Sequence, residues 1–407
     1  MQPNSSAKTH DRVPGEVFRA FLKLGLTSFG GPIAHLGYFR DELVLRRRWL
    51  SEAAYADLVA LCQFLPGPAS SQVGFALGYL RGGPAGAMLA WVAFTLPSVA
   101  LLLAFAFAAE SFGGTMGQHA IHGLKLVAVA IVAQAVWGMA RSLAPDPQRA
   151  TIALAALLIV TFIPTAFGQV AAIAAGAIFG TFWCRLLDSR SEGHLPVKIS
   201  RRLGLLLIAL FFVLLLGLPV TIAFWPTQTL ALFEAFYRAG ALVFGGGHVV
   251  LPLLEARVVE SGWVSADAFL AGYGATQAVP GPLFTFAAYL GAIAEPGPDG
   301  LLGAGVALLG IFLPGMLLLM GMLPFWDTLR RSTSARAGMA GTNAAVVGIL
   351  GAALYQPIWT SAVLSATDFA VAISAFILLT AWKAPPWLVV VATVAGSMAL
   401  GLAAPHG

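Results

Sequence analysis

The sequence predicts an all-α polytopic membrane protein, and three observations lead to this fold class. Of its 407 residues, 58% are apolar and only 10% are charged, against roughly a quarter charged in a typical soluble domain. The mean hydropathy is +0.84, so polar side chains are too few to cover a folded surface in water, and the rest must face lipid. Long uncharged stretches also alternate with short charged ones along the chain. A water-soluble protein is therefore excluded, and the lipid bilayer is the first partner we expect.

Composition divides the chain into five parts. Residues 1–16 are polar and lack an apolar stretch followed by a small-residue cleavage site, so we expect an N-terminal cytoplasmic tail without a signal peptide. Residues 17–184 and 236–404, called the first and second halves below, hold most of the apolar stretches. Between the halves we expect a basic cytoplasmic linker at 185–204 and a connecting transmembrane helix at 205–225.

About nine uncharged stretches predict full membrane spans. The two shortest have about thirteen residues, against the ~20 that a bilayer core requires, so we expect tilted or partly sunken hairpins there. The stretches are residues 84–109, 119–140, 151–163, 166–183, 205–225, 301–325, 340–354, 369–382 and 387–404.

Four more apolar stretches are interrupted by residues that break helices. They predict broken helices or re-entrant loops, because proline removes a helical hydrogen bond and irregular backbone at membrane depth must be buried in protein or line a cavity. The interruptions are Gly30, Gly31 and Pro32 in residues 24–39; Pro66, Gly67 and Pro68 in 58–80; Gly245, Gly246 and Gly247 in 242–254; and Pro280, Gly281 and Pro282 in 269–293.

These interruptions recur in the same order in both halves, which predicts an internal duplication. The sequence F-G-G-P at 29–32 corresponds to F-G-G-G at 244–247, and Q-F-L-P-G-P at 63–68 corresponds to Q-A-V-P-G-P at 277–282. Further on, F-T-L-P-S at 94–98 corresponds to I-F-L-P-G at 311–315, and the segment from Gly123 to that from Gly341. Glycine and proline are common in membrane helices, but four landmarks at nearly constant spacing make chance recurrence the weaker explanation.

The charges near the interruptions predict that the two halves are inverted relative to each other. Basic residues flank those of the first half, whereas acidic residues flank those of the second. By the positive-inside rule, the first-half loops then face the cytoplasm and the second-half loops face the outside. The flanking residues are Arg40, Arg46, Arg47, Arg48 and Arg81 in the first half, and Glu255, Arg257, Glu260, Asp267, Glu295 and Asp299 in the second. Two inverted repeats with discontinuous helices are typical of secondary transporters, which hold their substrate near the bilayer midplane.

The break after Pro68 predicts an anion site. A half-helix that starts there directs free N–H groups and the positive end of its dipole at the break. Glycine amides at the other breaks permit close approach of a ligand. Neutral side chains could complete the cage: Thr27, Ser28, Gln63, Ser70, Ser71, Gln277 and Thr285. The alternative is that P-G-P only kinks a span while the hydroxyls bond their own helix.

These motifs resemble the chromate ion transporter family in its long, two-domain form. The likeness rests on F-G-G-P at 29–32 followed by a basic stretch, on the two Q-x-x-P-G-P motifs, and on the duplicated halves, and it covers about residues 17–402. The second glycine motif departs from the pattern, since it reads F-G-G-G. The resemblance implies a multi-pass protein of the bacterial inner membrane that exports chromate, with sulfate as the close structural analogue.

Three ionisable residues at depth have two interpretations each. Lys125 interrupts an uncharged span, so it is either a counter-charge for a dianion or a side chain that reaches to the interface. His35 and His248 follow the glycine breaks and either couple transport to protons or satisfy a free carbonyl. We expect Asp57, which follows a predicted helix cap, to lie at the interface.

The absent motifs limit the alternatives. There is no phosphate-binding loop for ATP, no metalloprotease motif and no nucleophile elbow. Cys62 and Cys184 lie in apolar runs without metal-ligand spacing. We therefore expect no enzyme, catalytic residue, cofactor, metal or nucleic-acid partner. The prediction is a secondary transporter of a tetrahedral oxyanion, with a transporter of sulfate or another small anion, or an anion channel, as alternatives, and a homodimer as its assembly.

Overall fold

The computed structural model describes residues 12–109, 115–184, 195, 199–244, 246–298 and 300–403, and this part of the chain contains helices and no strands. The predicted all-α fold is confirmed. The helices of the first half are α1 (Arg12–Thr27), α2 (Gly31–Phe39), η1 (Arg40–Arg46), α3 (Glu52–Phe64), α4 (Ala69–Ala109), α5 (Thr115–Leu143), α6 (Pro147–Phe162) and α7 (Ala166–Trp183).

The connecting helix and the helices of the second half come next along the chain. The helices are α8 (Arg201–Phe224), α9 (Gln228–Leu242), η2 (Gly247–Val249), α10 (Val250–Val258), α11 (Ala266–Thr276), η3 (Leu283–Thr285), α12 (Phe286–Ile293), α13 (Gly300–Met322), η4 (Leu323–Phe325), α14 (Trp326–Leu329), α15 (Thr333–Ala353), η5 (Leu354–Trp359), α16 (Thr360–Ala362), α17 (Ala366–Thr380) and α18 (Pro386–Ala403). Most of the predicted linker at 185–204 lies outside the described residues.

All four predicted interruptions separate helices. They fall between α1 and α2, α3 and α4, α9 and α10, and α11 and α12. Local sequence explains the helix starts: Gly30 has a φ of 98° before Pro32 in the first turn of α2, and the Ser51 and Ser265 side chains cap α3 and α11. Each half therefore begins with two broken segments.

One predicted boundary lies inside α4. The apolar stretches 58–80 and 84–109 were expected as separate segments, and α4 consists of two helical parts separated by a kink of non-helical backbone, with Gly78 of the first part packed against Gly86 and Ala90 of the second. The kink lies at Gly82 and Gly83, whose φ values are −133° and 63°. Glycine adopts these angles without a steric penalty, so the first helical part ends just after Arg81 and the chain turns into the second.

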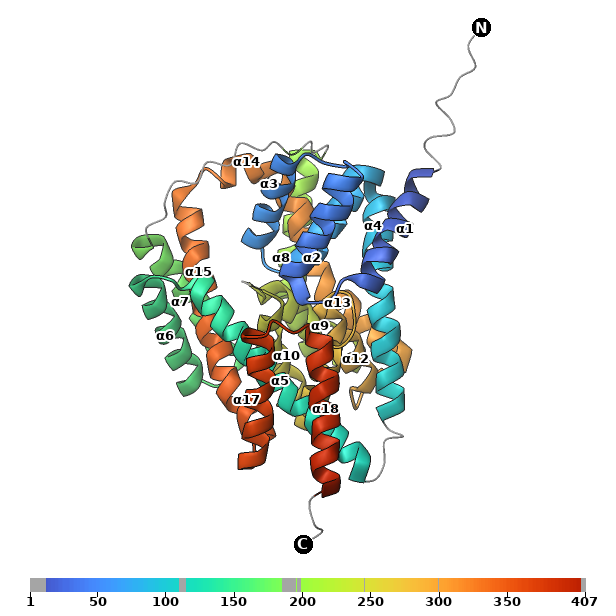
Figure 1. Cartoon of the computed structure of the whole chain (residues 1–407). Coiled ribbons are helices and arrows are strands. Elements are labelled where there is room, and N and C mark those ends of the chain that lie inside the picture. Colours follow the sequence, from blue (N-terminus) through green and yellow to red (C-terminus); the bar gives the residue numbers. More distant parts are fainter. Residues whose placement is uncertain are drawn as a thin grey trace.

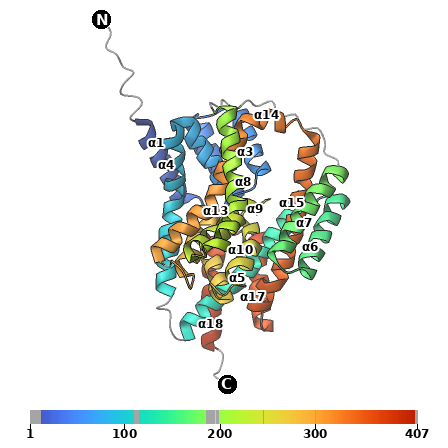
Figure 2. The ribbon, with the colours of Figure 1, turned by 180° about the vertical axis from the view of Figure 1, so that it is seen from behind.

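Within the described residues, five helical stretches are long and apolar enough to cross a membrane: residues 69–108, which include the break at Gly82 and Gly83, 116–143, 201–224, 300–329 and 333–362. The helices α6, α7, α17 and α18 are shorter and apolar, so the total of nine spans stays a prediction. Figure 2 shows α8 along the outside of the molecule, where it packs on α9 and α13. Most of its side chains are exposed, which suits a helix that faces lipid.

The last two helices of each half pack against the other half. Helices α6 and α7 contact α15, and α17 and α18 contact α5 (Figure 1). Glycines permit these close approaches, because Gly123 of α5 lies directly on Val394 of α18 and Gly341 of α15 lies directly on Gly176 of α7. The helix pairs α6–α7 and α17–α18 therefore each pack on the opposite half and join the two halves into one body.

An ion pair with a fully buried carboxylate also joins the halves. Asp57 of α3 is 0% exposed, and Arg330, which follows α14, donates to it at 2.8 Å. Arg330 also pairs with Asp327 at 2.8 Å. Asp57 therefore lies inside the protein, while its expected depth at the membrane interface stays a prediction.

Candidate functional site

The proline-glycine-proline breaks cross the other half at the centre of the molecule. The amide of Gly67 donates a hydrogen bond to the Val243 carbonyl at 2.7 Å, and the amide of Gly281 donates to the Ser28 carbonyl at 2.9 Å. Val243 and Ser28 each precede the phenylalanine of the glycine motif in their own half. The two bonds are thus related by the predicted repeat. Each joins the proline-glycine-proline break of one half to the glycine break of the other half.

The backbone at these crossings requires glycine. Gly67 and Gly281 have φ values of 117° and 103°, in the region that L-residues avoid. A Cβ on Gly67 would lie 3.0 Å from the Gly315 Cα, and a Cβ on Gly281 would collide with the Ser98 hydroxyl. Gly315 and Ser98 are repeat-related as well, so the same close approach is built twice.

The glycine motifs meet beside these crossings. Gly30 and Gly31 have φ values of 98° and 79°, and Gly246 has 149°. A Cβ on Gly247 would lie 3.3 Å from Pro32. Gly245, which we also predicted for the site, lies outside the described residues.

The two breaks lead into different kinds of helix. Ala69, Ser70 and Ser71 form the first turn of α4, as predicted. The equivalent residues of the second half form the short 3-10 helix η3, in which Thr285 donates both its amide and its hydroxyl to the Pro282 carbonyl, at 3.0 and 2.7 Å. The first break therefore leads directly into the N-terminus of a long helix, whereas the second leads into a 3-10 turn that Thr285 closes on Pro282.

Several predicted hydroxyls and His35 gather near the first break. The His35 Nδ1 lies 3.4 Å from the Ser70 hydroxyl, and its ring packs edge-on against Phe94 at 5.4 Å. Ser28 and Ser71 are buried, and their hydroxyls have no hydrogen-bond partner among the described residues. Thr27 differs, because it is exposed and donates back to the Lys23 carbonyl at 2.8 Å.

The predicted glutamines lie in less buried places than the hydroxyls. Gln63 is exposed and Gln277 is half-buried. A third glutamine, Gln72, is buried and donates to the carbonyls of Pro66 and Gly315 at 3.0 and 2.9 Å. Gln72 could not be selected from the sequence, because its position in the second half is a phenylalanine and its partner lies 243 residues away.

The remaining ionisable candidates have partners. His248 bonds the Tyr273 hydroxyl through Nδ1. Lys125 donates to Asp267 at 2.6 Å, and their side chains are 8% and 66% exposed. Lys125 is therefore not an isolated cation, which favours the interfacial interpretation, while its role as a counter-charge stays a prediction.

Basic side chains from α1 and from η1 and its C-terminal end collect around Glu42. Glu42 accepts hydrogen bonds from Lys23 at 2.8 Å, from Arg46 at 3.1 Å and from Arg47 at 2.9 Å. Burial alone would raise the pKa of Glu42, but the bonds and charges of Lys23 and Arg47 outweigh it and hold the pKa at about 2. The predicted arginine cluster is thus partly neutralised by one buried carboxylate.

Lipid-facing helices around a centre of crossed, broken segments with buried neutral donors define a multi-pass membrane protein of the transporter class. Comparison with known families agrees with this class. The family model described as chromate transporter matches residues 15–181 and 230–399, so the chain belongs to the chromate transporter family. This family consists of transporters, not enzymes, and the chain fits a multi-pass protein of the bacterial inner membrane.

Individual relatives match over most of the chain. A chromate transport protein of Pseudomonas aeruginosa is 30% identical over 83% of this chain and 79% of its own length. A probable chromate transport protein of Synechococcus elongatus is 29% identical over 92% and 93%. A chromate transport protein of Cupriavidus metallidurans is 28% identical over 82% and 80%. No solved structure matches the chain.

Proposed function

We propose that this protein is a secondary active transporter that exports a tetrahedral oxyanion, most of all chromate, across the inner membrane. The observation that carries the proposal is the pair of hydrogen bonds from Gly67 and Gly281 to Val243 and Ser28. They bring both broken segments of both halves to one centre, as in transporters that expose a central site alternately to each side. The names of the relatives supply chromate as the substrate.

Repeat-related contacts support the inverted duplication on which alternating access depends. Gly25 lies against the Phe94 carbonyl, and the equivalent Gly240 lies against the Ile311 carbonyl. The family model matches once in each half. Helix α3 lies toward the upper end in Figure 1, whereas α11 begins beside Lys125, in the early turns of α5, which starts at the lower end. The halves would then run in opposite directions through the membrane.

Neutral donors fit a dianion that must be released as well as bound. The amides in the first turn of α4 and the hydroxyls of Ser28, Ser70 and Ser71 can donate to oxyanion oxygens, and the helix dipole adds positive potential. A cage without a fixed cation binds more weakly than an arginine clamp. Moderate affinity suits a carrier, because a substrate held too tightly leaves slowly.

The energy source and direction belong to the same proposal. His35 and His248 are the candidates for coupling to protons, since both lie beside the glycine breaks and histidine titrates near neutral pH. Arginines around the loops of the first half support a cytoplasmic position for that side. Export would then carry the anion away from the arginine-rich side, driven by an ion gradient.

The test is uptake of labelled chromate into everted inner-membrane vesicles, which corresponds to export from the cell. We expect saturable uptake that depends on a proton gradient or membrane potential, is abolished by ionophores and is absent from vesicles without the protein. Unlabelled sulfate added as a competitor measures the selectivity between the two anions. No energised uptake would refute active export, and currents far above carrier turnover would instead identify an anion channel.

A further inference from the structure

The repeat places chemically opposite side chains at the two crossings. Around the crossing of Gly281 with Ser28, the first half contributes polar residues, whereas the second half has mostly apolar residues at the equivalent positions. The repeat-related pairs are Ser28 and Val243, His35 and Val250, Ser70 and Phe284, Ser71 and Thr285, Thr95 and Phe312, and Ser98 and Gly315. Similar backbones therefore carry one polar and one largely apolar crossing.

The polar crossing has unmet hydrogen-bonding capacity. The Ser28, Ser71 and Thr95 hydroxyls and the His35 Nε2 have no partner among the described residues. Their side chains are also buried, with exposures of 1%, 3%, 2% and 1%. A buried polar atom without a partner costs about 1–3 kcal/mol, and four in one region call for a ligand that satisfies them.

Contacts connect these residues into one region. The Gly281 amide bonds the Ser28 carbonyl, and a Cβ on Gly281 would collide with the Ser98 hydroxyl. Ser98 donates in turn to the Thr95 carbonyl at 3.2 Å. His35 contacts both helical parts of α4, the second through Phe94 and the first turn of the first through the Ser70 hydroxyl. These contacts thus link the residues that carry the unmet groups to the N-terminus of α4.

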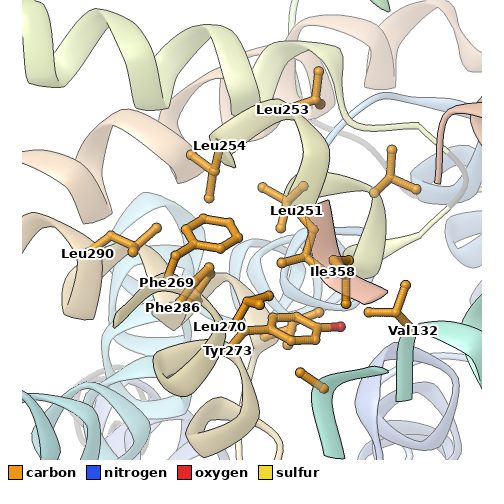
Figure 3. Close-up of a cluster of buried hydrophobic side chains, with 14 of the residues drawn as sticks. Val132, Leu251, Leu253, Leu254, Phe269, Leu270, Tyr273, Phe286, Leu290 and Ile358 are labelled. Carbon is orange, nitrogen blue, oxygen red and sulfur yellow. The ribbon is translucent and has the colours of Figure 1, made fainter. Parts of the chain in front are cut away.

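The equivalent positions at the second crossing are filled with apolar side chains, although the nearby Gln72 keeps a buried Oε1 without a partner among the described residues. Phe312 packs on Phe284 at 5.9 Å. Figure 3 shows Phe286, two residues further along the chain, within a cluster that includes Phe269 and Tyr273, with ring distances of 5.2 and 5.8 Å. The only hydroxyl among the six equivalent positions, that of Thr285, already donates to the Pro282 carbonyl. Nothing at these positions calls for an ion.

We infer that the oxyanion binds on one side only, at the hydroxyl-lined N-terminus of α4, and that the equivalent break of the second half is a packed structural counterpart. This inference rests on the proposed function and deepens it. Hydroxyls and the ring N–H of a neutral histidine can all donate to the oxygens of one tetrahedral oxyanion. One transport cycle then moves one anion, although the architecture is duplicated.

Repeat-related substitutions test the inference with the purified full-length protein. Ser71→Ala and Thr95→Val should weaken chromate binding, measured as the chromate-induced rise in melting temperature, by about tenfold or more each, since hydrogen bonds to charged groups are strong. Without chromate these variants should melt no lower than the wild type, because each removes an unmet polar group. Thr285→Val should show the reverse, with a lower melting temperature and unchanged chromate affinity. Ser71→Thr, which copies the second half, should retain binding.

The outcomes separate this inference from the proposed function. Equal losses of chromate affinity in Ser71→Ala and Thr285→Val would overturn the one-sided site. A lower melting temperature for Ser71→Ala with unchanged chromate affinity would also overturn it, because the hydroxyls would then hold buried water. Failure of active export in vesicles would refute only the transport mechanism, since binding is measured independently with chromate and with sulfate.

Discussion

Replacing Gly281 with alanine perturbs one crossing in two separable ways. The residue has a φ of 103°, so any L-residue there is strained. The added methyl would also collide with the Ser98 hydroxyl, a side-chain atom that a second substitution can remove. At Gly67 the added methyl would instead lie 3.0 Å from the Gly315 Cα, which no side-chain change relieves. Gly281 is therefore the better position for a quantitative test.

The expected destabilisation follows from these two contributions. A left-handed backbone costs about 1–2 kcal/mol for an L-residue, and overpacking a close contact costs about 1–3 kcal/mol. Gly281→Ala should then lower the free energy of unfolding by about 2–5 kcal/mol. Adding Ser98→Ala removes the collision but leaves the φ strain, so the double variant should regain about 1–3 kcal/mol.

Chemical denaturation in detergent measures the stability, and chromate uptake by everted vesicles measures the function. Gly305→Ala is the matched control, because a Cβ on Gly305 meets nothing within 4 Å and its φ is not in the left-handed region. We expect Gly281→Ala to impair both properties and Gly305→Ala to impair neither, as we expect of Ser189→Ala in the linker. Equal behaviour of Gly281→Ala and Gly305→Ala, or no recovery with Ser98→Ala, would refute the close crossing.

Three further predictions concern charged side chains. Asp57→Asn removes the buried charge beside Arg330, and breaking a buried ion pair costs about 3–5 kcal/mol of unfolding free energy. We expect a loss at the lower end of this range, because Asp327 still pairs with Arg330. A loss under ~1 kcal/mol would show that the pair behaves as an exposed one. The pKa of Glu42 is lowered to about 2, so its ion pairs stabilise the protein fully above pH about 4.5 and are lost as the pH falls toward 2; Glu42→Gln should flatten this acid dependence of the melting temperature. Lys125→Gln should leave chromate affinity unchanged, whereas weaker binding would establish Lys125 as a counter-charge.

The breaks could be predicted from the sequence because their cause is local. Proline lacks the amide that a helix needs, and glycine alone adopts the left-handed angles found at Gly67 and Gly281 without strain. Both requirements depend only on the residue type at the position. All four interruptions were therefore found at the predicted residues, and the hydroxyls after Pro68 were correctly placed in the first turn of a helix.

The partners of the site residues could not be predicted in the same way. Lys125 looked isolated because Asp267 lies 142 residues further along the chain. The pairing of Asp57 could not be foreseen because Arg330 is 273 residues away. Such pairs depend on how the halves pack, which a single sequence without coordinates does not specify. The same limit hid Gln72, whose carbonyl partner Gly315 belongs to the other half.

In each half, a buried carboxylate pairs the helix before the glycine break with the helical segment after it. The carboxylate lies after the break in the first half and before it in the second. In the first half, Glu42 of η1 accepts from Lys23 of α1 at 2.8 Å, and in the second half Glu234 of α9 accepts from Arg257 of α10. Glu42 and Arg257 occupy repeat-related positions and carry opposite charges. An ion pair is equally attractive with its charges exchanged, whereas a break needs the backbone of glycine or proline. The duplication can therefore be recognised from the glycines and prolines, but not from the charged residues that pair the two helices on either side of each glycine break.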